Sequence, residues 1–146
     1  MPIINTYKVF TVITVFYLLC SYPTGARQTE LNEADFPATM KEIGLTVGDA
    51  EGHIDARYWP ETEEDGKRLA AMFQLVEEFW LNRGTDAAAG IAADAITASN
   101  NLTTVARAND YSGSRNALAA IRKTCGACHQ DFREETEDGY RIKSGS

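Results

Sequence analysis

The chain has 146 residues, 44% of them hydrophobic and 24% charged, a balance typical of a globular protein. The formal net charge is −7 at pH 7, so we expect the protein to repel nucleic acid and anionic membrane surfaces. The two histidines are too few for a credible Ser/His/Asp arrangement, and we predict that the protein is not an enzyme.

Residues 1–26 have the features of a secretory signal. Lys8 is their only charged residue, Val9 to Cys20 is apolar apart from two threonines, and small residues up to Ala26 offer a cleavage site. The apolar core is shorter than the ~20 residues that span a membrane, so the pattern favours cleavage over an uncleaved anchor. We therefore predict a periplasmic protein whose mature part, residues 27–146, is one domain.

Four later segments have the apolar spacing of amphipathic helices. The four predicted helices are one beginning at Asp35, one ending near Asn82, an alanine-rich one beginning at Thr85 or Asp86, and one from about Ser114 to Glu135. Residues 54–60 are predicted to be a loop between the first two helices. A turn at Asp138-Gly139 and a short tail follow. Because no convincing strand-like alternation is present, the sequence predicts an all-α fold, an antiparallel four-helix bundle.

The last predicted helix contains Cys125-Gly126-Ala127-Cys128-His129. Two cysteines separated by two residues and followed by histidine form the haem c attachment signature, in which each thiol bonds to a haem vinyl group and the imidazole ligates the iron. Residues three and four apart share one helix face. The apolar stripe of this helix comprises Leu118, Ile121, Cys125, Cys128 and Phe132. We therefore predict one covalent haem c inside the core, near the C-terminal end of helix four.

Two other interpretations of the cysteine pair are open at this point. A structural zinc site usually has four ligands, and the other histidine in the chain is His53. A thioredoxin-type redox pair follows a strand in a βαβ unit, and no strand-like run precedes Cys125. Both interpretations therefore have less support than haem attachment.

With these residues in view, the chain resembles the class II c-type cytochromes, the cytochrome c′ family. The resemblance covers most of the mature chain and rests on the segment Lys123 to Arg133 in the last of four helices. Ordinary small cytochromes c carry the motif near the N-terminus instead. Family members also have a basic residue four positions after the histidine, here Arg133, which the resemblance places near the proximal haem face or a propionate.

The resemblance suggests two functions that differ in the sixth iron ligand. Low-spin relatives place a methionine of helix one on the iron and transfer electrons, and the matching position here is Met40. Cytochromes c′ proper are five-coordinate and bind nitric oxide or carbon monoxide. We predict electron transfer with His129 and Met40 as axial ligands, with gas binding as the alternative. Met72 is a second candidate sulfur ligand, and bis-histidine ligation through His53 is a minor alternative.

The predicted partners are redox proteins. Arg122 and Lys123 are expected to form a basic patch beside the haem, which would orient an acidic partner. The resemblance also implies homodimers formed through helix one. A third interpretation is a haem subunit that associates with a larger dehydrogenase or reductase.

Overall fold

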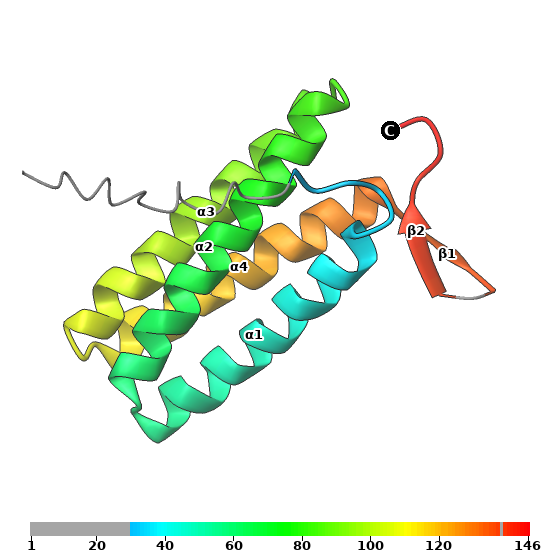
Figure 1. Ribbon diagram of the computed structural model, residues 1–146. Helices are drawn as coiled ribbons and strands as arrows, with labels where there is room; N and C mark the ends of the chain where they lie inside the picture. Colours follow the sequence, from blue (N-terminus) through cyan, green and yellow to red (C-terminus); the bar gives the residue numbers. More distant parts are fainter. Residues whose placement is uncertain (1–29, 138) are drawn as a thin grey trace, which may run out of the picture.

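The computed structural model describes residues 30–137 and 139–146, which form a four-helix bundle followed by a two-stranded hairpin (Figure 1). The elements are α1 (Phe36–Ala56), α2 (Trp59–Asn82), α3 (Asp86–Arg107), α4 (Tyr111–Phe132), β1 (Arg133–Thr136) and β2 (Gly139–Ile142). Turns of two or three residues join the helices, so helices adjacent in the chain run antiparallel. The predicted four-helix bundle is confirmed.

The predicted secretory signal, residues 1–26, lies outside the described residues. The cleavage after Ala26 and the domain boundary at residue 27 therefore stay predictions. Within residues 30–137 and 139–146, no helix is long and apolar enough to cross a membrane.

α1 continues through residues that the sequence assigns to a loop. It reaches Ala56, and Arg57 then ends it in the left-handed conformation (φ 59°), where its backbone N–H donates to the carbonyl of Ile54 (3.1 Å). Ile54 is fully buried. The predicted loop from residue 54 to 60 is therefore wrong, because burial of Ile54 extends the apolar face of the helix by a further turn.

α2 and α3 approach each other closely at Gly66. A Cβ atom added to Gly66 would lie 2.5 Å from the hydroxyl oxygen of Thr103 and 2.9 Å from its backbone nitrogen. The buried face of α3 consists mostly of small residues: Ala88, Ala89, Ala92, Ala95, Ser99 and Ala106. Small side chains on both helices therefore allow the two backbones to pack tightly.

We expect Gly66→Ala to lower the free energy of unfolding by about 1–3 kcal/mol, because the backbone of α3 would have to move. Urea unfolding followed by circular dichroism measures this change. Gly48→Ala is the matched control, since Gly48 is an exposed α1 residue whose added Cβ has no neighbour within 4 Å. The control should raise the unfolding free energy by about 0.5–1 kcal/mol. Equal effects of the two substitutions would contradict the close approach of α2 and α3.

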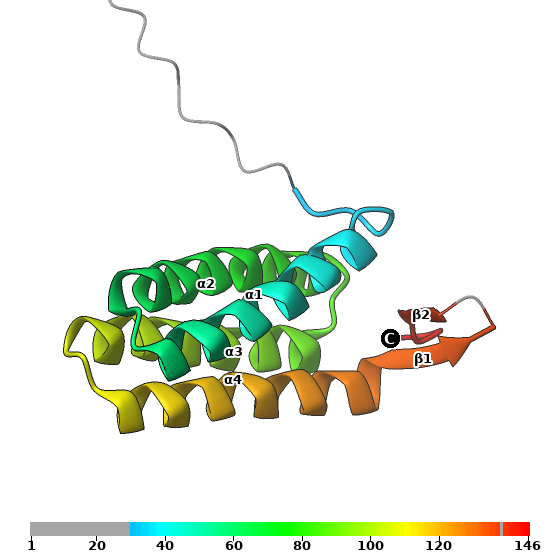
Figure 2. The same ribbon diagram turned by 90° about the horizontal axis from the view of Figure 1, so that it is seen from below.

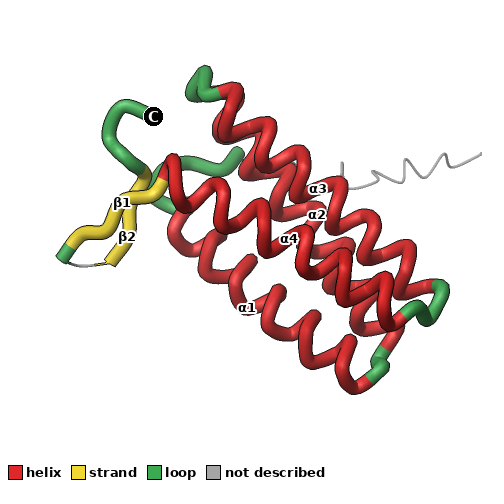
Figure 3. The backbone as a smooth tube through the Cα atoms, turned by 180° about the vertical axis from the view of Figure 1, so that it is seen from behind, coloured by secondary structure: helices red, strands yellow, loops and turns green. Residues whose placement is uncertain are grey.

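α1 diverges from α2 beyond the turn that joins them, as Figures 1 and 3 show. Ion pairs attach α1 to both neighbouring helices: Glu42 pairs with Arg68 of α2, and other acidic residues of α1 pair with α4. The guanidinium group of Arg122 donates two hydrogen bonds to the carboxylate of Glu51 (2.9 and 2.7 Å), and Arg115 lies 3.3 Å from both Glu51 and Asp55. These hydrogen bonds, above all that from Arg122, lower the pKa of Glu51 to about 2. Glu51 therefore stays ionised and paired at neutral pH.

The C-terminal hairpin differs from the prediction. The sequence predicts a helix to Glu135 and then a tail, but α4 ends at Phe132, and Arg133 is extended (φ −116°, ψ 137°). β1 and β2 pair antiparallel with Arg133 opposite Ile142, and Figure 2 shows the hairpin projecting past the end of α4. Phe132 and Ile142 both pack against the hydrophobic core. Tertiary packing of these side chains therefore outweighs the local helical pattern.

Candidate haem-binding site

A cavity of about 760 Å³ is lined by side chains from all four helices and from β2. Its volume is within the range typical of sites that hold small molecules and cofactors. Large apolar side chains make up much of its lining, including Phe36, Phe73, Val76, Trp80 and Phe132. The cavity therefore suits a ligand with a substantial apolar body.

Cys125, Cys128 and His129 line this cavity from the C-terminal half of α4. All three residues are half-buried, and both cysteines are free thiols. Their spacing of three and four residues places them on one face of the helix. Ile121, one turn earlier, is fully buried and holds this face toward the core. The motif therefore presents two thiols and one imidazole to a single cavity.

Burial also determines the protonation of these groups. It raises the pKa of the Cys125 thiol, and it raises the pKa of Cys128 to about 11 with a contribution from Cys125. Burial lowers the pKa of His129, and the positive charge of Arg133 lowers it further. At neutral pH both thiols are protonated and the imidazole is neutral. His129 therefore keeps the lone pair that a metal ligand needs.

The structure separates the two candidate methionines. Met40 of α1 is half-buried and lines the cavity, together with Ile43 and Gly44. Met72 of α2 packs against the hydrophobic core, but it does not belong to the cavity lining. The structure therefore brings Met40, and not Met72, to the cavity that His129 lines.

His53 lies near the other end of α1, and it is not part of the cavity lining. Its Nδ1 is 2.7 Å from Oδ2 of Asp65 on α2. Burial raises the pKa of Asp65, whereas the hydrogen bond from His53 acts against that rise. His53 therefore connects α1 to α2, and the geometry gives no support to bis-histidine ligation.

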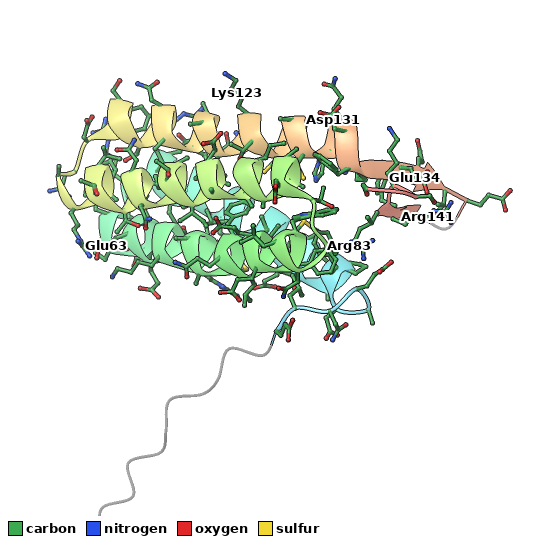
Figure 4. The ribbon with its side chains drawn as sticks, turned by 90° about the horizontal axis from the view of Figure 1, so that it is seen from above. Glu63, Arg83, Lys123, Asp131, Glu134 and Arg141 are labelled. Carbon is green, nitrogen blue, oxygen red and sulfur yellow. The ribbon has the colours of Figure 1, made fainter. Side chains whose placement is uncertain are left out.

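The three basic residues singled out near the motif have different surroundings. Arg133 lines the cavity, and its guanidinium carbon lies 4.1 Å from the ring centroid of Tyr140. Arg122 lines the cavity as well, and Glu51 neutralises its charge. Lys123 is exposed and points away from the bundle in Figure 4. Arg122 and Lys123 therefore do not share one surface, because neighbouring residues of a helix point in different directions.

The side chains of the lining together indicate what the cavity is suited to hold. Trp80 lines the cavity, and its indole Nε1 is buried with no hydrogen-bond partner among the described residues. A buried donor left unpaired costs about 1–3 kcal/mol, so the packing of the Trp80 ring against Phe79 and Phe132 has to offset that cost. Haem c has an apolar ring, carboxylate acceptors and vinyl groups for two thiols. The lining, with its apolar side chains, two thiols, imidazole and thioether, therefore fits haem c.

The alternative interpretations of the motif fit these surroundings less well. The Cys125–Cys128 segment lies within a helix, whereas a thioredoxin-type pair follows a strand. In the part of the chain that the structure describes, no three His, Cys, Asp or Glu side chains are placed to hold a metal ion. Covalent haem attachment is the interpretation that the cavity supports best.

Three residues of β2 belong to the cavity wall although sequence reasoning assigns them to a tail. They are Tyr140, Arg141 and Ile142. The sequence does contain a signal for a hairpin here. The dipeptide Asp138-Gly139 is typical of a turn, and an aromatic, a basic and a β-branched residue follow it. Four residues are too short a run for that signal to predict a strand by itself.

Comparison with known proteins identifies the domain. A family model described as Cytochrome C′ matches residues 32–133. This range is more than half of the chain and contains all four helices. Searches of curated proteins and of solved structures gave no significant match. Members of this family are haem proteins, usually periplasmic and typically without enzymatic activity. On the basis of this match, which agrees with the four-helix bundle and with the Cys125, Cys128 and His129 side chains that line the cavity, the chain belongs to the cytochrome c′ family.

Proposed function

We propose that this protein is a periplasmic electron-transfer cytochrome that holds one haem c through Cys125 and Cys128. His129 and Met40 are the proposed axial ligands of the iron. One observation carries this proposal: Met40 of α1 and His129 of α4 line the same cavity as both thiols, whereas Met72 and His53 do not.

The protein side chains have separate roles in this proposal. The two thiols would hold the haem covalently, and the neutral imidazole of His129 would offer its lone pair to the iron from α4. The sulfur of Met40 ligates from α1 and raises the reduction potential. The bound haem would supply a one-electron ferric/ferrous couple. The apolar walls, including Phe73 and Val76, exclude water and so contribute to the potential.

A specific observation favours gas binding as the second candidate function. Gly44 lies one helical turn after Met40 and also lines the cavity, and a Cβ added there would have no neighbour within 4 Å. The α1 wall therefore has free space beside Met40. In this second candidate, Met40 packs near an open iron position, and a small diatomic ligand uses that space.

Absorption spectra of the oxidised and reduced protein, with and without carbon monoxide, test the proposal. Covalent attachment should keep the pigment with the protein in acidified organic solvent. Six-coordinate iron should give low-spin spectra that carbon monoxide changes little. A high-spin spectrum that carbon monoxide changes readily would support gas binding instead, and a colourless protein would reject both functions.

A further inference from the structure

The C-terminal hairpin forms part of the cavity wall beyond the family match. The match ends at Arg133, which is also the first residue of β1. β2 then contributes three consecutive residues to the cavity lining, Tyr140, Arg141 and Ile142. Figures 1 and 2 show the hairpin at the C-terminal end of α4, the helix that carries the attachment motif. The hairpin therefore adds to the cavity wall residues that lie outside the matched range.

Several contacts hold β2 against the cavity. The backbone N–H of Lys143 donates to the carbonyl of Phe132 (2.9 Å), and Ile142 packs against the hydrophobic core. The guanidinium group of Arg133 stacks on the ring of Tyr140 at 4.1 Å, a cation–π contact. Both backbone and side-chain contacts therefore position the strand.

The cavity lining has a charge opposite to that of the whole chain. The charged residues in the lining are Lys41, Arg122, Arg133, Arg141 and the acidic Glu33. The chain as a whole carries a net charge of −7. Glu51 pairs with Arg122 and Glu134 pairs with Arg141, and Lys41 of α1 and Arg133 of β1 are the other basic residues of the lining. Basic side chains thus gather beside a largely apolar cavity.

Among these basic residues, Arg141 is placed to bind a carboxylate of a ligand in the cavity. Its Nε lies 2.6 Å from Oε1 of Glu134 on the paired strand. Figure 4 labels both residues on the hairpin. This contact engages one edge of the guanidinium group and leaves the donors of the two terminal nitrogens for a further partner. Guanidinium groups match carboxylates in both charge and geometry. A carboxylate on the cavity's ligand would therefore suit Arg141.

We propose that the hairpin completes the haem site, with Arg141 binding a propionate carboxylate of the cofactor. This inference rests on the proposed haem function and adds residues that lie beyond the family match. Tyr140 and Ile142 act as positioning residues, because their contacts with Arg133 and the core fix the strand that carries Arg141.

Resonance Raman spectra of the full-length haem protein test this proposal through the propionate bending bands. Arg141→Gln is expected to shift these bands and to make the midpoint potential more negative, because a cation beside the haem is lost. Backbone amides of β2 should also exchange hydrogen about tenfold faster, since a charge-assisted hydrogen bond no longer holds the strand. Lys143→Gln is the matched control, because Lys143 is exposed, follows the same strand and does not line the cavity.

A second variant separates binding from loosening of the hairpin. Glu134→Gln removes the ion partner of Arg141 and keeps the guanidinium group, so the propionate bands should stay close to those of the wild type. Matching bands and potentials in Arg141→Gln and Lys143→Gln would overturn the inference, as would the same band shift in Glu134→Gln. Covalent haem content of the wild type is measured first. Its absence would reject the proposed function itself, whereas unchanged bands in a haem-loaded protein would reject only the role of the hairpin.

Discussion

A Cys125→Ala, Cys128→Ala variant is expected to lack haem and to lose cooperative thermal unfolding. The cavity that would remain has a volume of about 760 Å³. At ~24 cal/mol per Å³, an unfilled cavity of this size corresponds to roughly 18 kcal/mol. Water entering through the open side makes this an upper bound, but the total stability of a domain is only about 5–15 kcal/mol. The helices around the cavity should therefore not keep their packing without the cofactor.

Circular dichroism gives the measurement for this variant. We expect residual helical signal in the far ultraviolet, little near-ultraviolet signal and a broad thermal transition, as in a compact state without fixed packing. Gly126→Ala is the control, because Gly126 lies between the two cysteines, is exposed and has no neighbour within 4 Å of an added Cβ. This control should keep both haem and a sharp transition. A sharp, native-like transition in the haem-free double variant would show that the bundle does not depend on the cofactor.

Much of the fold can be predicted because helical periodicity is a local property. The apolar spacing within each helix predicts which of its residues are buried. One such residue from each helix is Ile43, Leu69, Leu102 or Leu118, and all four are at most 4% exposed. The attachment motif is equally local, since the spacing of Cys125, Cys128 and His129 requires them to share a helix face. These features follow from residue order alone.

Other features depend on contacts between distant residues. Ile142 reaches the core beside α4 only after the chain has turned back at the hairpin, so no helical or alternating pattern reveals the strand in advance. Arg122 and Lys123 are adjacent in sequence, yet Glu51 of α1 pairs with only the first of them. Trp80 looks like one more apolar residue of its helix, and its unpaired N–H becomes visible only in three dimensions.

The two methionines show the same distinction. Met40 and Met72 both lie on apolar stripes, and methionine on such a stripe usually fills the core. Residue order does not separate them by itself. The directions of α1 and α2 do, because only Met40 lines the cavity that contains His129. The choice of ligand is therefore a tertiary prediction that substitution can test.

Met40→Leu is expected to convert low-spin iron to a high-spin form that binds carbon monoxide. Leucine keeps a similar apolar volume, so the substitution removes the sulfur while largely preserving the packing of α1. The reduction potential should also fall, since a methionine ligand raises it. Absorption spectroscopy with and without carbon monoxide, together with a potentiometric titration, measures both changes.

Met72→Leu is the matched control, because it removes a sulfur that packs against the core outside the cavity lining. A volume-conserving change at such a position usually costs less than about 1.5 kcal/mol of stability, and the spectrum should stay low-spin. An unchanged low-spin spectrum in Met40→Leu would mean that another side chain completes the coordination. Loss of low-spin character in Met72→Leu alone would assign the ligand to α2, and α1 would then have to be a wall of the cavity rather than the source of a ligand.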